Sequence, residues 1–219
     1  MRKHFDDQIA QLGEQMMAMG ALVENTIERA IRALQTDDMA EAAAIRDGDH
    51  IVDEKEREVE AMCIHMLLQQ QPVARDLRTI SAALKMITDM ERIGDQADDI
   101  AEIIPFLGGR TGAECESVSL MARETIRMVT ESVDAYVKGD VELAKAVIAH
   151  DDVVDDCFDN VKSSLIRLIT ERREDAEYAL DLLMIAKYFE RIGDHATNVA
   201  EWVVFSVTGV HKEWNGEDN

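Results

Sequence analysis

Four pairs of acidic residues, each an acid followed four positions later by aspartate, occur at matching places in the two halves of this 219-residue chain. Because an α-helix turns by about 100° per residue, each pair places two carboxylates side by side on one helix face. Like charges at this spacing repel each other by roughly 0.2–0.5 kcal/mol in water, and a bound cation would offset that repulsion. Carboxylate oxygens suit hard cations such as Mg²⁺, Mn²⁺, Ca²⁺ or iron. The candidate metal ligands are Asp49/Asp53, Glu91/Asp95, Asp151/Asp155 and Glu190/Asp194.

A solvated helix face is the simpler interpretation of any single acid pair. The chain has 45 Asp and Glu against 23 Lys and Arg, and its formal net charge is −22. Acid pairs therefore arise often in it, although their matching positions favour a metal site. Both interpretations stay open from the residues alone. Asp99 in the first half and Asn198 in the second are further candidate ligands.

The acid pairs belong to an internal duplication. The segment 51–53 (IVD) corresponds to 153–155 (VVD), at an offset of 102 residues (51 to 153). The segment 91–95 (ERIGD) recurs unchanged as 190–194, at an offset of 99 residues (91 to 190). One structural unit is therefore present twice, with a small length change between the two matched segments.

Apolar residues recur at helical spacing along most of the chain, and only two prolines interrupt it. Pro72 and Pro105 predict the ends of two helices. Asp38 predicts a helix N-cap, with Glu41 completing a capping box. Glycines 94 and 193, both inside predicted helices, indicate close approach of a neighbouring helix. The pattern predicts helices over residues 5–35, 38–70, 74–104, 114–138, 140–171 and 175–207.

These elements predict an all-α fold of two tandem three-helix bundles related by internal duplication. We place the first repeat at residues 1–107 and the second at 113–208, joined by the glycine-rich linker at 105–112. Residues 209–219 form a polar tail.

The acidic charge excludes several functions. A nucleic-acid binder needs a basic surface, and an anionic membrane would repel this chain. No apolar run approaches the roughly 18 residues that a membrane span needs, so we expect no membrane insertion. The N-terminal residues lack the apolar stretch of a signal peptide. Three widely spaced cysteines are typical of reduced thiols, and the expected location is the cytoplasm.

The chain resembles the PhoU family. The resemblance is carried by the segment 71–78 (QPVARDLR) and by the two ERIGD segments, and it extends from about residue 5 to 207. It implies two pseudo-symmetric three-helix bundles. It also implies a cytoplasmic regulator without enzymatic activity, which negatively regulates bacterial phosphate uptake and the phosphate-starvation two-component response. The implied partners are the ATPase of the phosphate ABC transporter, a membrane sensor histidine kinase and a second copy of the chain in a homodimer.

The resemblance also implies metal binding through the paired motifs, with Fe, Zn, Mn or Mg as the ion. Asp49 and Asp53 would act with Glu91 and Asp95, and the corresponding four acids would act in the second repeat. Two departures separate the repeats: Thr197 and Asn198 replace Asp98 and Asp99, and residues 172–175 (RRED) replace the QPxAxDLR pattern.

Two other interpretations stay open. A di-metal carboxylate enzyme of the helical-bundle type needs a Glu-x-x-His motif, which this sequence lacks. A plain helical scaffold with solvated acidic faces needs no special motif.

Overall fold

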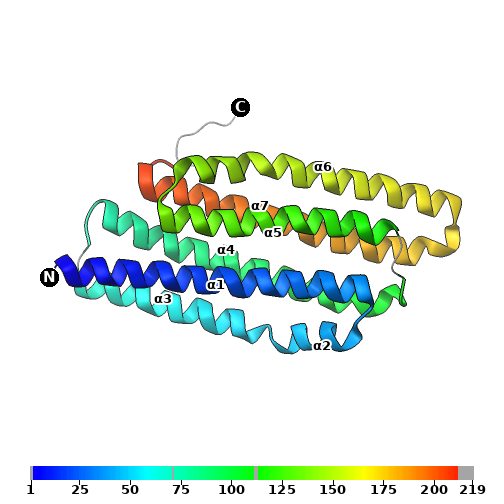
Figure 1. Ribbon diagram of the computed structural model, residues 1–219, viewed down its shortest axis with the longest axis horizontal. Coiled ribbons are helices and arrows are strands. Elements are labelled where there is room, and N and C mark those ends of the chain that lie inside the picture. Colours follow the sequence, from blue (N-terminus) through cyan, green and yellow to red (C-terminus); the bar gives the residue numbers. More distant parts are fainter. Residues whose placement is uncertain (1, 71, 111–112, 212–219) are drawn as a thin grey trace.

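The computed structural model describes residues 2–70, 72–110 and 113–211, and these form long helices that run side by side (Figure 1). The first repeat contains α1 (Arg2–Thr36), α2 (Met39–Asp47), α3 (His50–Gln70) and α4 (Arg75–Ile103), followed by the 3-10 turn η1 (Ile104–Leu107). The second contains α5 (Ala113–Lys138), α6 (Val141–Glu171), the 3-10 turn η2 (Arg173–Asp175) and α7 (Ala176–Thr208). The predicted all-α duplicated bundle is confirmed. Of the predicted tail, residues 212–219 lie outside the described residues.

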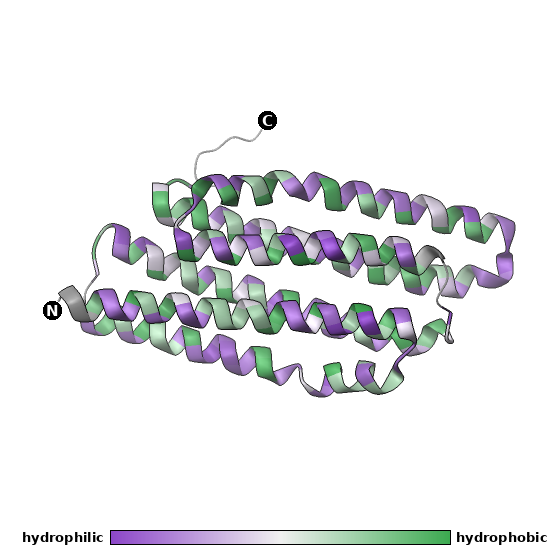
Figure 2. Ribbon diagram, viewed as in Figure 1, coloured by the Kyte–Doolittle hydropathy of each residue, from purple (hydrophilic) through white to green (hydrophobic). Residues whose placement is uncertain are grey.

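The core is a continuous apolar interior shared by both repeats. Hydrophobic and hydrophilic residues alternate around each helix, as expected for helices that bury one face (Figure 2). The central helices α4 and α7 pack against each other more extensively than any other pair of described elements. The acidic residues therefore occupy the outer faces and the edges between neighbouring helices.

The predicted second helix, residues 38–70, is wrong in one respect, because two helices occupy this range. Gly48 and Asp49 form a tight break in which the Gly48 N–H donates to the Ile45 carbonyl at 2.9 Å and α3 starts afresh at His50. At the offset of 102, Gly48 matches His150, which lies inside the unbroken helix α6. Glycine is a poor helix former, so this difference favours the break, although Gly94 and Gly193 lie inside unbroken helices.

Asp38 caps α2 as predicted, since its Oδ1 accepts hydrogen bonds from the N–H groups of Ala40 and Glu41. The capping box is not completed, because the Glu41 carboxylate pairs with Arg29 of α1 at 2.6 Å. In the second repeat, Asp140 caps α6 in the same manner. An aspartate thus caps the N-terminus of α2 in the first repeat and of α6 in the second.

The two ERIGD glycines allow close approach of the paired helices, as the sequence predicts. A Cβ atom on Gly94 of α4 would lie 3.1 Å from Val52 Cγ1 of α3. A Cβ atom on Gly193 of α7 would lie 3.3 Å from Val154 Cγ1 of α6. Each glycine leaves room for a valine of the neighbouring helix to pack against it, and this contact fixes the distance between the two helices.

None of the helices in the described part of the chain combines the length and the apolar composition needed to cross a bilayer.

We expect Gly94→Leu to lower the free energy of unfolding by about 1–3 kcal/mol, because the added side chain meets Val52 in a packed interface. Gly13→Leu is the matched control, since a Cβ atom there meets nothing within 4 Å. It should change stability by no more than about 1 kcal/mol, in the stabilising direction. Urea unfolding followed by circular dichroism measures both. Equal effects of the two substitutions would contradict this account of Gly94.

Candidate metal centre

Three of the predicted ligands lie together in the first repeat. Asp49 lies in the break between α2 and α3, Asp53 in the first turn of α3, and Asp95 on α4. One carboxylate oxygen from each lies within 4.8 Å of the other two, and all three side chains are half-buried. Oxygens at this separation can surround one cation, since metal–oxygen distances of about 2.0–2.6 Å place ligand oxygens up to about 5 Å apart.

Burial and, after it, like charges raise the pKa values of Asp49 and Glu91. Burial raises the pKa of Asp49, and the charges of Asp95 and Asp53 raise it further. Burial and then the charge of Asp95 raise the pKa of Glu91, which lies outside the trio. The repulsion between the carboxylates is therefore present in the folded protein, and a cation would relieve it.

Arginines offset part of this repulsion from the rim of the group. Arg92 approaches Asp95 at 2.9 Å and Glu91 at 3.4 Å, and Arg57 approaches Asp53 at 3.1 Å. Both arginine side chains are largely exposed, so these ion pairs contribute little to stability and can yield to a bound ion.

Asp98 joins this group, although its position in the sequence did not single it out as a ligand. It lies one turn along α4 from Asp95, and its buried Oδ1 accepts no hydrogen bond from the described residues. Burial, and then the charge of Asp49, raise the pKa of Asp98 to about 6. Among the predicted extra ligands, Asp99 lies within the electrostatic reach of Asp95, which raises its pKa after burial does.

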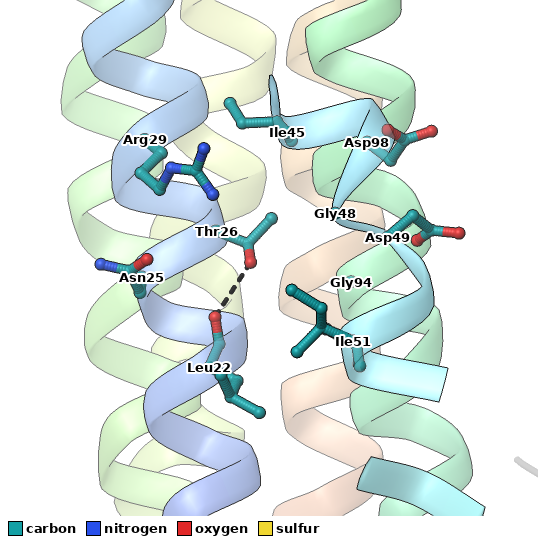
Figure 3. A pocket seen from close by; sticks show the side chains of 11 residues that line it. Leu22, Asn25, Thr26, Arg29, Ile45, Gly48, Asp49, Ile51, Gly94 and Asp98 are labelled. Carbon is teal, nitrogen blue, oxygen red and sulfur yellow. Dashed lines mark hydrogen bonds between the residues drawn. The ribbon is translucent and has the colours of Figure 1, made fainter. Parts of the chain in front are cut away.

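A cavity of about 110 Å³ lies beside the break, between α1 and the α2–α3 segment. Figure 3 shows Arg29 on the α1 side of this cavity, whereas the carboxylates of Asp49 and Asp98 point away from α1. Because Arg29 is also paired with Glu41, it does not neutralise the acid group.

The second repeat places its four predicted ligands around the contact between α6 and α7, where Asp155 and Asp194 are exposed. Partial desolvation and then the charge of Asp194 raise the pKa of Asp151. Among all described His, Cys, Asp and Glu residues, a trio with ligand atoms within 4.8 Å occurs only in the first repeat. The carboxylates of the second acid group are therefore more exposed to solvent and less closely grouped than those of the first.

Lys187 adds a cation to the second group, and the acid pairs in the sequence do not indicate it. Its Nζ forms an ion pair with Glu190, three residues along α7. At the offset of 99, Lys187 matches Thr88, which donates a hydrogen bond to Glu56. A comparison of the repeats for unmatched cations would have found this lysine.

Asn198 takes part in a different contact. Its Nδ2 donates to Asp89 Oδ1 of α4 at 3.1 Å, and His195 Nδ1 lies 2.9 Å from the same oxygen. These three residues join α7 to α4 across the contact between the repeats. The structure thus places Asn198 at the interface of the repeats and not among the acids of the second group.

An all-α duplicated bundle with acid groups between paired helices defines the class of this protein. A family model described as the PhoU domain matches residues 16–104 and again residues 118–203. The chain belongs to the PhoU family.

Similar proteins agree with this assignment. A phosphate-specific transport system accessory protein PhoU homolog from Clostridium acetobutylicum is 33% identical over 216 residues, covering 98% of this chain and 99% of its own. A crystal structure of PhoU from Pseudomonas aeruginosa has a TM-score of 0.88 at 31% identity, covering 94% of this chain and 100% of its own. The crystal structure of the phosphate transport system regulatory protein PhoU from Streptococcus pneumoniae shows the same fold. It has a TM-score of 0.87 at 24% identity, covering 94% of this chain and 98% of its own.

The raised pKa of Asp98 predicts how stability depends on pH in the metal-free protein. The folded state binds this proton more tightly than the unfolded state, whose carboxyl titrates near 3.8. The bound proton therefore stabilises the folded state fully below about pH 4, and this stabilisation is lost as the pH rises through about 6. At pH 7.5 and in chelator, Asp98→Asn should raise the free energy of unfolding by on the order of 1 kcal/mol.

Urea unfolding at pH 4.5 and 7.5 measures this effect, with the exposed Glu28→Gln as the control that should change little at either pH. A variant Asp98→Asn that is less stable than the parent at pH 7.5 would contradict the proposed repulsion.

Proposed function

We propose that this chain is an accessory regulator of a phosphate-specific transport system. It restrains phosphate uptake and keeps the phosphate-starvation two-component response off when phosphate is plentiful. The match of both repeats to the PhoU domain, with relatives similar along nearly the whole chain, carries this proposal. The proposed partners are the ATPase subunit of the phosphate ABC transporter and the membrane sensor histidine kinase.

The protein works by binding and not by catalysis in this proposal. Its relatives in Clostridium acetobutylicum and Pseudomonas aeruginosa are named as accessory proteins of a transport system. Cytoplasmic location and assembly as a homodimer, which the family resemblance implies, belong to the same proposal.

Removal of the gene from its host should leave alkaline phosphatase activity high even in medium rich in phosphate, because the kinase would no longer receive the repressing signal. Restoring the intact gene on a plasmid should restore repression. Phosphatase activity measured per cell in high and low phosphate tests this loss of repression. Normal repression in the deletion strain would overturn the proposed regulatory role.

We further propose that the first acid group holds a metal ion, with Asp49, Asp53 and Asp95 as its ligands and Glu91 beside them. The mutual repulsion of these acids and the separation of their oxygens support a cation of the Fe, Zn, Mn or Mg type. The ion would supply positive charge that fixes the break between α2 and α3 against α4. The second group (Asp151, Asp155, Glu190 and Asp194) binds more weakly, because Lys187 already neutralises Glu190.

Elemental analysis of the protein purified without chelator tests the metal proposal. Changing the first group to Asp49→Asn, Asp53→Asn, Glu91→Gln and Asp95→Asn should remove most of the bound metal. The matched change of the second group, to Asn at 151, 155 and 194 and to Gln at 190, should remove less. Trace metal in the parent, or equal loss in both variants, would contradict the proposed difference between the groups.

A further inference from the structure

The connection between α3 and α4 ends in an unfavourable backbone conformation. Ala74, the residue before α4, has a φ of +51°, which is uncommon for a residue other than glycine. It also offers no side-chain hydrogen bond to the first N–H groups of α4, whereas Asp140 caps α6. Such departures from local preference concentrate at functional sites.

Apolar side chains are exposed at the same place. Leu68 at the end of α3 is 77% exposed and Val73 is 72% exposed, and Leu77 on the first turn of α4 is 42% exposed. These three residues and Arg75 are termed the Arg75 surface below. Exposed apolar side chains that cluster in this way favour contact with another molecule.

The two helices that meet at the Arg75 surface run further into their connection than the matching helices of the second repeat do. The last residue of α3, Gln70, matches position 172 at the offset of 102, but α6 ends at 171. The first residue of α4 matches position 174 at the offset of 99, but α7 begins only at 176. The three extra residues of the first repeat therefore lengthen both helices at this end of the molecule, where the N-terminus of α1 also lies (Figure 1).

The cations beside this surface are not neutralised by the described residues. Arg75 is exposed and forms no ion pair with them, and the buried Nε of Arg78 donates no hydrogen bond to them. At the corresponding turn of the second repeat, Asp175 pairs with Arg110 at 2.8 Å and with Arg172 at 3.8 Å. In a chain with a net charge of −22, cations without acidic partners mark a surface where negative charge would be attracted.

A recess adjoins Arg75 on the side that faces the other helices. It has a volume of about 370 Å³ and lies between the ends of α1, α4, α5 and α7. Its charged lining residues are Arg75, the acid Asp76, and Lys138, whose Nζ pairs with Asp134 at 2.7 Å. It is large enough to admit one or two side chains of a partner.

We propose that the Arg75 surface and its adjoining recess dock an acidic, apolar-centred segment of a partner protein. Apolar side chains of the partner pack on Leu68, Val73 and Leu77, and its carboxylates face Arg75 at the edge of the recess. The inference rests on the proposed function, since it assigns a docking surface to the regulator. The rest of the strongly acidic molecule repels such a segment, so the charge distribution directs the acidic segment to the Arg75 surface.

Two other occupants fit this surface less well. A symmetric contact whose two-fold axis passes near Arg75 would bring this residue close to its own equivalent, which is unfavourable. An anionic membrane would be repelled by the net charge of −22.

Binding of the purified full-length chain to its transporter ATPase and to the cytoplasmic region of its sensor kinase tests the inference. The docking variant combines Arg75→Glu with Leu68→Ser. The control variant makes the same changes at the opposite end of the molecule, Arg173→Glu with Leu180→Ser, where both residues are exposed. Circular dichroism and thermal unfolding verify that both variants fold.

Interferometry in about 0.15 M salt should show at least about a tenfold weaker Kd for the docking variant with at least one partner, and a change below about twofold for the control. Equal weakening by both variants, or none, would overturn the inference while leaving the proposed function intact. Failure of the parent protein to bind either partner would overturn the proposed function and this docking surface together.

Two further measurements separate the competing occupants. Light scattering after size-exclusion chromatography reports self-association, and sedimentation with vesicles of phosphatidylglycerol and phosphatidylcholine reports membrane binding. Loss of self-association or of vesicle binding in the docking variant, with partner binding unchanged, would overturn the inference. Unchanged self-association and no vesicle binding by the parent, together with weakened partner binding, would support it.

Discussion

In each repeat a valine packs against a glycine of the neighbouring helix, and the acid group of that repeat depends on this contact. Val52 lies against Gly94, and Val154 lies against Gly193. A larger residue at either glycine would separate the two helices and their carboxylates with them. Apolar packing thus holds together charges that repel one another, and in the first repeat it brings three carboxylate oxygens within 4.8 Å. The free energy of burial stabilises an arrangement that electrostatics alone would not form.

The duplication gave the protein two copies of this arrangement, and the copies have diverged in charge. Lys187 neutralises Glu190 in the second repeat, whereas the matching Thr88 carries no charge. Thr197, which lies beside Asp151, replaces Asp98. In the other direction, Arg57, which pairs with Asp53 in the first repeat, matches Asp159 in the second. These exchanges give two acid groups on the same helical frame different surrounding charges.

Helical periodicity predicts the helices well, because apolar faces buried over 20 to 30 residues leave a long regular signal. The internal repeat predicts the duplicated architecture and the packing role of Gly94 and Gly193. The break at Gly48 is not predicted, since one glycine costs a helix only about 1 kcal/mol and is often tolerated. In the candidate site, Lys187 pairs with Glu190 three residues along α7, so helical spacing together with a comparison of the repeats could have predicted that contact. Asn198 shows the limit of the sequence: it meets Asp89 from a distant part of the chain, and sequence spacing carries no record of that contact.

Neighbouring residues of α7 face different parts of the molecule. Asp194 belongs to the second acid group, while His195 and Asn198 contact Asp89 on α4. A rotation of α7 about its own axis that brings Asp194 inward would pull His195 and Asn198 away from Asp89. The contacts of His195 and Asn198 with Asp89 therefore link the orientation of α7 at the second acid group to the packing of α7 against α4, the helix that carries Asp95 of the first.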